Sequence, residues 1–448
     1  MISNPRGPAG GLAHAVFLAL LALPISGITA ADAQYRRVVL DPDSDARVVA
    51  LAIRFPAGTT EDPRGSEGTA FMLGRVLERQ GDQALSRHGA NLSVTVGPQE
   101  FLILLVTEPE RWEGALGELE SIVFQASVRD DILEAIRMEL SQILRFEAGA
   151  PVRVFEEERM SFLLGPEHLA ARPSQGTPET IERIGASDLE AFRSTHIRRG
   201  NAILAVSGPS DSGGRMGENE VLLLERRLES EGRSEPPTAA DSTPQAPDLR
   251  LYRTVSPGLE IPQESPGPPA WTTGARLLLD RELTSSWISV AFPFPLGTPE
   301  LLLDFVGHLI VEELTPSPPD PGLFAAQAEQ TTIDRAPVLV ITASVDPRAT
   351  ARWEDRLVES LATLAEAPPA GAFFELARRR FRAGILLEHA LPEQRAGWLA
   401  RQVAAGTDPA IDLGIEVWSL LRPAVGRAAA AAGPPRTIVM GPGAMMGN

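Results

Sequence analysis

The pattern of apolar positions predicts the same buried strand twice along the chain. The stretch 47–58, RVVALAIRFPAG, is almost continuously apolar and ends in Pro-Ala-Gly. The stretch 286–297, SWISVAFPFPLG, has the same character, ends in Pro-Leu-Gly and begins 286 − 47 = 239 positions later. A short apolar run closed by Pro and Gly is typical of a strand buried in a sheet. We therefore expect two similar strands, one in each half of the chain.

Two further features repeat in the same order. Arg-Trp-Glu opens an amphipathic helix at 111–113 and again at 352–354, 241 positions later. A strand running into Gly-Pro closes each half, at 208–209 and at 441–442, 233 positions apart. Three features in one order at nearly one offset indicate a tandem duplication. The apolar side chains with helical spacing are Trp112, Leu116, Leu119 and Val123 in the first helix, and Trp353, Leu357, Leu361 and Leu364 in the second.

Other elements of the first half follow from local signals. We expect a helix from about Thr69 to Arg79, a strand pair over Asn91–Val96 and Phe101–Thr107, and a long helix over Asp130–Phe146. Ser187-Asp-Leu-Glu190 has the pattern of a capping box at the start of another helix. Strands mixed with packed helices in both halves predict an α+β fold.

A signal peptide before the first half and a linker after it define the predicted domain boundaries. Residues 1–33 read as a signal peptide, with Arg6, an apolar run to Leu23 and the cleavage pattern Ala31-Asp32-Ala33. This apolar run is too short for a membrane anchor, so we expect an exported, periplasmic protein with no integral membrane segment after signal removal. The halves are expected at 34–228 and 274–448, joined by a Pro-rich linker over 229–273.

The net charge and the composition exclude several kinds of binding and catalytic site. The net charge of −18 argues against nucleic-acid binding, which needs a basic face. The absence of Cys excludes disulfides, thiolate metal sites and cysteine nucleophiles, and six His leave few metal ligands.

The order of segments resembles the pitrilysin/insulinase family of zinc peptidases over nearly the whole mature chain. This resemblance implies two homologous half-domains, each a mostly antiparallel sheet packed with helices. The segments that carry it are Phe55–Gly58, Gly89–Asn91, Gly176–Thr180, Ile184, Asp188-Leu189, Phe192 and Gly200–Ala202.

The zinc motif of that family, His-x-x-Glu-His, is missing. The matching helix has Phe71 and Arg75 at the ligand positions and Gly74 at the position of the general base. Phe has no donor atom, Arg stays protonated, and Gly carries no base. The third family ligand would fall near Ser141, with Glu134 and Glu139 close by. We therefore expect no metal, no cofactor and no catalysis by this chain alone.

Other candidate groups are weaker. The family's substrate-holding Gly-Leu-x-Tyr would match 322–325, GLFA, which lacks the Tyr, and no Arg lies in 317–322. His308 and Glu312 have metal-ligand spacing without a visible third ligand, and His389 reads as solvated surface. The serine-protease-like run 210–214 reads as a turn.

The resemblance also implies a partner. In the family an edge strand beside the zinc helix captures peptides, which points to Asn91, Val94 and Val96. The alternative for these residues is an ordinary sheet strand with one face packed on helices. The family's chamber needs four such domains, so this chain is expected to complete the chamber of a catalytic zinc-peptidase subunit of similar fold in peptide or protein degradation. The alternative is a scaffold that binds peptides or unfolded proteins with no role in proteolysis.

Overall fold

The computed structural model describes residues 35–42, 46–209, 248–251, 276–316, 320–333, 336–367, 369, 371–405 and 415–443. The expected signal peptide, the run 210–214 and most of the expected linker lie outside these residues. No helix among the described residues is both long enough and apolar enough to cross a membrane.

The first sheet has six strands in the order β3-β4-β2-β5-β1-β6. Strands β3, β4, β2 and β5 are antiparallel, whereas β1 pairs parallel with β5 and with β6. Strand β6 comes from within the expected linker. The strands are β1 (Arg37–Pro42), β2 (Val49–Phe55), β3 (Asn91–Val96), β4 (Phe101–Thr107), β5 (Ile203–Gly208) and β6 (Asp248–Leu251).

The second sheet repeats this order. It has five strands in the order β7-β11-β8-β10-β9, which read backwards matches β3-β4-β2-β5-β1 strand for strand. In this sheet the pair β11–β7 is parallel and the other pairs are antiparallel, so β11–β7 corresponds to β5–β1 of the first sheet. The predicted α+β fold of two half-domains with mostly antiparallel sheets is confirmed. The strands are β7 (Arg276–Asp280), β8 (Ser286–Pro293), β9 (Leu323–Ile333), β10 (Ala336–Val345) and β11 (Arg436–Gly441).

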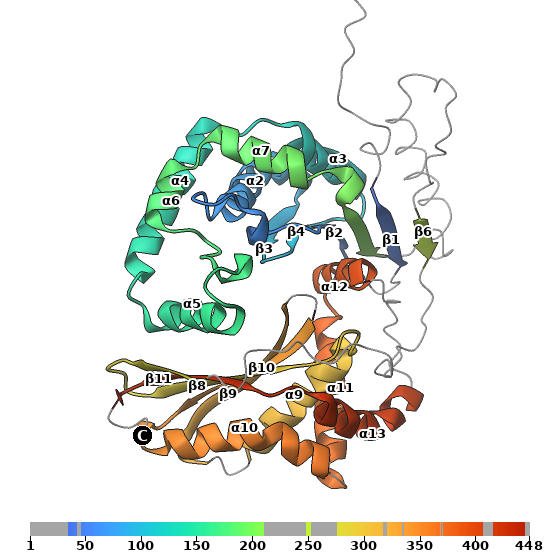
Figure 1. Cartoon of the computed structure of the whole chain (residues 1–448). Coiled ribbons are helices and arrows are strands. Elements are labelled where there is room, and N and C mark those ends of the chain that lie inside the picture. The colour runs from blue at the N-terminus through green and yellow to red at the C-terminus, as the bar shows by residue number, and fades with distance from the viewer. Residues whose placement is uncertain are drawn as a thin grey trace, which may run out of the picture.

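Helices cover both sheets (Figure 1). The two predicted apolar stripes are confirmed, because all eight of their residues are buried. The capping box at Ser187 is wrong: the helix begins at Ala186, and the carboxylate of Asp188 accepts the N–H of Gly185. The helices are α2 (Thr69–Leu85), α3 (Trp112–Glu120), α4 (Asp130–Glu147), α5 (Pro151–Leu164), α6 (Pro178–Arg183), α7 (Ala186–His196), α9 (Glu300–Leu314), α10 (Thr350–Glu366), α11 (Ala372–Glu388), α12 (Pro392–Ala405) and α13 (Ile415–Ala431).

The two halves exchange one helix each. Helix α12 of the second half lies on the first sheet, where Leu399 and Val403 are buried against Ala52, Leu102 and Ala205. Helix α5 of the first half lies on the second sheet. There Leu163 is buried against Ala291, Val338 and Val340, and Phe155 is buried against Ile438 and Met440. Figure 1 shows α5 over β8 and β11, and α12 below the first sheet. Each sheet is thus covered on one face by a helix of the other half.

Arginines fasten the exchanged helices at their carboxyl ends. Arg436 of β11 donates to the carbonyls of Phe162 and Leu163, at 2.5 and 2.9 Å, in the last turn of α5. Arg37 of β1 donates to the carbonyl of Val403, at 2.9 Å, in the last turn of α12. A cation at a helix carboxyl end is favourable because the carbonyls there lack intrahelical partners.

Candidate functional site

Helix α2 carries the positions of the missing zinc motif, and a buried carboxylate fixes its start. Asp62 accepts hydrogen bonds from the backbone N–H groups of Gly68 and Ala70, both at 2.8 Å. Burial raises the pKa of Asp62 to about 7, against the opposing effect of these two hydrogen bonds and of Arg172. Asp62 therefore fixes the start of α2, immediately before the positions of the missing zinc motif.

Gly74, at the position of the general base, is closed in by the neighbouring strand. A Cβ atom on this residue would lie 2.8 Å from Cγ2 of Val96 and 3.2 Å from Cγ1 of Val94. Contacts this short force the side chains of Val94 and Val96 to move before a residue larger than glycine fits here. Phe71, at the first ligand position, is partly buried against the core of the first half.

Arg75, at the second ligand position, is held by carboxylates. Its guanidinium lies 2.5 Å from Glu78 and 3.5 Å from Glu139 of α4, and Glu139 also pairs with Arg79 at 3.0 Å. A permanently charged guanidinium therefore lies between the acidic groups that a metal ion would otherwise need. The residues present do not fit a zinc ion.

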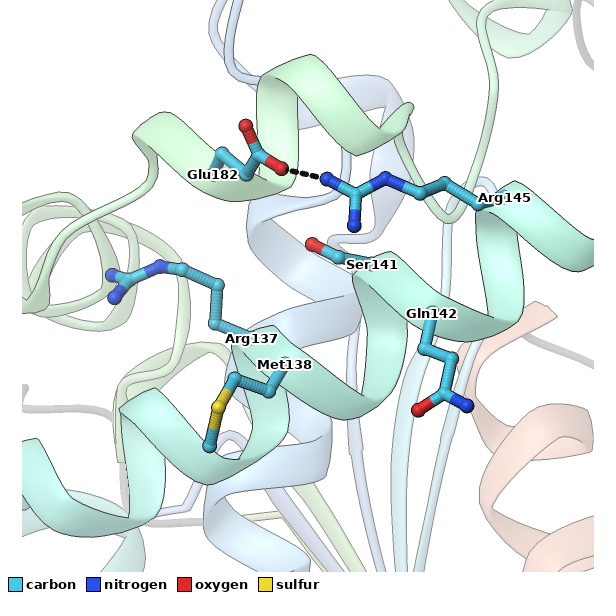
Figure 2. A pocket seen from close by; sticks show the side chains of 6 residues that line it. All are labelled: Arg137, Met138, Ser141, Gln142, Arg145 and Glu182. Carbon is cyan, nitrogen blue, oxygen red and sulfur yellow. Dashed lines mark hydrogen bonds and ion pairs between the residues drawn. The ribbon is translucent and has the colours of Figure 1, made fainter.

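Ser141 is not part of this cluster. It faces α6 and lines a shallow hollow of about 450 Å³ together with Arg137, Met138, Gln142, Arg145 and Glu182 (Figure 2). The hydroxyl of Ser141 is buried and has no hydrogen-bond partner. Of the nearby acids that the sequence pointed to, Glu139 faces Arg75, whereas Glu134 pairs with Arg137. In the described part of the chain, no group of three or more His, Cys, Asp or Glu could hold a metal ion.

Strand β3, with Asn91, Val94 and Val96, lies at the edge of the first sheet. Val94 and Val96 face α2 and are half-buried, whereas Asn91 is exposed. The backbone N–H of Val94 points away from β4 and donates to Oε1 of Glu78 at 3.3 Å. Glu78 was not predicted from the sequence, although its position one turn beyond Gly74 on the same helix face indicates this contact.

The remaining candidates take structural places. His308 contacts the carbonyl of Ala377 at 3.1 Å and lies 3.9 Å from Glu312. The reading of His389 as solvated surface is wrong, because its ring packs on Trp398 at 4.8 Å and burial lowers its pKa. The segment 317–322 contains no Arg, but the guanidinium of Arg352 in α10 lies beside Gly322. It pairs with the carboxylate of Asp320 at 2.8 Å.

Comparison with known proteins identifies the fold. No protein-family model matches the chain, and no curated protein matches it by sequence. The structure of an inactive domain of an M16 peptidase from Pseudomonas fluorescens superposes with a TM-score of 0.65 and 14% identity, over 91% of this chain and 96% of that one. The chain has the fold of the M16 peptidases. This is the group to which the pitrilysin/insulinase resemblance points.

Two further protease structures share this fold. A protease from Helicobacter pylori superposes with a TM-score of 0.67 and 14% identity, over 90% of this chain and 96% of that one. The periplasmic protease PqqL from Escherichia coli superposes with a TM-score of 0.63 and 12% identity, over 90% of this chain but only 44% of that one. A unit of this fold therefore occurs both as a chain of similar length and as part of a longer chain.

Proposed function

We propose that this chain is an exported, non-catalytic M16-like subunit that completes the chamber of a separate zinc peptidase of similar fold. This proposal rests on the residues that α2 has at the positions of the zinc motif. Phe71 and Arg75 stand at two metal-ligand positions, Arg75 is paired with Glu78 and Glu139, and Val94 and Val96 pack closely on Gly74, the position of the general base. A site closed by packing as well as by residue type has no route to zinc hydrolysis.

Two of the similar structures support a partner. One is named as an inactive domain, and another is named as complex III of Candida albicans. This chain covers less than half of PqqL, and the resemblance implies a chamber of four domains. In this proposal a second chain of similar fold supplies the other two domains of the chamber.

The first experiment measures metal and activity. The mature protein, purified alone, should contain less than stoichiometric zinc and should leave a quenched fluorescent peptide library uncut. Stoichiometric zinc, or cleavage that a chelator abolishes, would contradict the proposal. The partner is then sought by affinity purification of the full chain from its native host. We expect a zinc peptidase of similar size; a monomer without any partner would favour the scaffold function instead.

The scaffold function has one observation in its favour, which is the free edge of β3. Past the end of this strand, a groove of about 460 Å³ continues between α5 and the loop 170–175, and its lining is mostly apolar. Its apolar side chains include Val96, Pro98, Val152 and Met160, and its charged side chains are Glu147, Arg153, Glu156, Glu157 and Arg172. An extended polypeptide added to β3 would pass into this groove. Saturable binding of unfolded peptides by the isolated chain is the expected result, and no binding at high micromolar concentration would overturn it.

A further inference from the structure

The free edge of β3 offers three residues to an added strand. The hairpin to β4 closes with a hydrogen bond from the N–H of Gly97 to the carbonyl of Glu100 at 2.8 Å. Hydrogen-bonded pairs alternate in an antiparallel ladder, so the pairs of Thr95, Ser93 and Asn91 with β4 are also of this type. The N–H and C=O groups of Leu92, Val94 and Val96 therefore point away from β4.

The middle one of these three residues is already engaged. The N–H of Val94 donates to Oε1 of Glu78, while Oε2 of the same carboxylate lies 2.5 Å from Nη1 of Arg75. Arg75 in turn contacts Glu139 on α4. The Glu78 carboxylate thus contacts Arg75 of α2 with one oxygen and Val94 of the edge strand with the other.

We propose that Glu78 is a removable cap on the edge of β3, so that an extended polypeptide can pair with this edge only after the carboxylate has left Val94. An added strand needs the N–H of Val94 for its own ladder, and the two acceptors cannot share it at full strength. Arg75 retains the displaced carboxylate, which keeps the open state accessible. This proposal rests on the proposed binding of polypeptides at β3.

The contact between Glu78 and Val94 gives α2 a role in this chain other than zinc binding. An uncovered edge strand is a site of unwanted pairing between chains, and proteins protect such edges with charged side chains. With Arg75 in place of a metal ligand, α2 holds a carboxylate against the edge. The helix that would carry catalysis in an active relative then controls access to the edge in this chain.

The first measurement is hydrogen exchange of the Val94 amide in the full mature chain. In Glu78→Ala we expect about tenfold faster exchange, since a hydrogen bond to a charged group contributes about that factor. Glu78→Gln keeps an acceptor oxygen and should exchange at nearly the wild-type rate. Glu139→Ala removes the ion pairs with Arg75 and Arg79 without touching β3, and it serves as the matched control. Unchanged exchange at Val94 in Glu78→Ala would overturn the cap.

The second measurement is binding of a fluorescein-labelled peptide of alternating threonine and valine with a lysine at each end. The cap predicts about tenfold tighter binding by Glu78→Ala than by Glu139→Ala, from the same hydrogen-bond contribution. Measurable but equal binding by the two variants would overturn the proposal. Faster exchange without peptide binding by any variant would leave the cap standing and would refute polypeptide binding at β3.

Discussion

At the scale of single residues, Gly74 shows how closely β3 packs on α2. The side chains of Val94 and Val96 lie within contact distance of a Cβ atom on residue 74. Placing the glutamate of the zinc motif at this position therefore requires these two valines to move as well.

Gly74→Glu is expected to lower the free energy of unfolding by about 1–3 kcal/mol, the usual cost of overpacking. The matched control is Gly384→Glu, a glycine inside α11 whose Cβ would meet no heavy atom within 4 Å. The control should be neutral or stabilising, since glycine is a poor helix former. Urea unfolding followed by circular dichroism measures both. Equal effects of the two substitutions would contradict the close approach of β3.

Asp62 gives a pH dependence with a definite sign. Its pKa is about 7 in the folded protein and near 3.8 when exposed, so the fold favours the protonated form. The stability contributed by this group is fully present below pH 4 and is lost as the pH rises to about 7. Comparing Asp62→Asn with wild type over this range, by thermal unfolding, should show a weaker decline in the variant. Glu61→Gln, an exposed neighbour, should leave the wild-type decline unchanged, and an equal decline in all three would refute the shifted pKa.

At the scale of elements, the sequence predicts most strands and helices but not their partners. Strands β3 and β4 were predicted with their observed bounds because their alternation and their Gly-Pro turn are local signals. The predicted first helix stopped at Arg79, whereas α2 continues to Leu85 and is followed by a 3-10 turn that ends at Gly89 in the left-handed conformation. The apolar stripe of α12 shows that the helix is buried, yet it carries no information on which sheet covers it.

In the candidate site, too, the sequence predicts the residue types but not the contacts between elements. The absence of ligands at Phe71, Gly74 and Arg75 is readable from the sequence because each residue's chemistry is local. The contact of Glu78 with Val94 joins α2 to a strand 16 positions further along the chain, and Ser141 turns towards α6 instead of Arg75. Such contacts depend on the angles at which helices pack, which side-chain periodicity does not fix.

Arg436 tests the fastening of an exchanged helix. Arg436→Ala leaves the carbonyls of Phe162 and Leu163 without their donor at a buried helix end, and we expect a loss of about 1–3 kcal/mol in the free energy of unfolding. Arg427→Ala, at an exposed position of α13, is the control and should change stability by less than about 0.5 kcal/mol. Chemical denaturation of both variants decides, and similar losses would show that the clamp on α5 contributes nothing specific.

At the scale of the whole molecule, the exchange of α5 and α12 makes each half a part of the other's core. Without α12, the first sheet would expose Ala50, Ala52, Leu102 and Ala205 to water, and without α5 the second would expose Val338 and Val340. Polar contacts across the same boundary reinforce this, including Arg159 with Glu329 at 2.7 Å and Arg401 with Glu100 at 2.9 Å. The molecule is a duplicated pair of units that fold as one.

The two halves should therefore assemble even when they are made as separate chains. We expect segments 34–251 and 252–448, co-expressed in one cell, to elute together in size-exclusion chromatography, because the apolar faces that hold them are buried between the halves. Each segment expressed alone should aggregate, since an uncovered sheet face is a large exposed apolar patch. Leu399→Asp, which places a charge between α12 and the first sheet, should abolish co-elution, whereas Leu387→Asp, at a side chain that is 73% exposed, should preserve it. Soluble, folded single halves, or co-elution that survives Leu399→Asp, would show that the exchanged helices do not hold the molecule together.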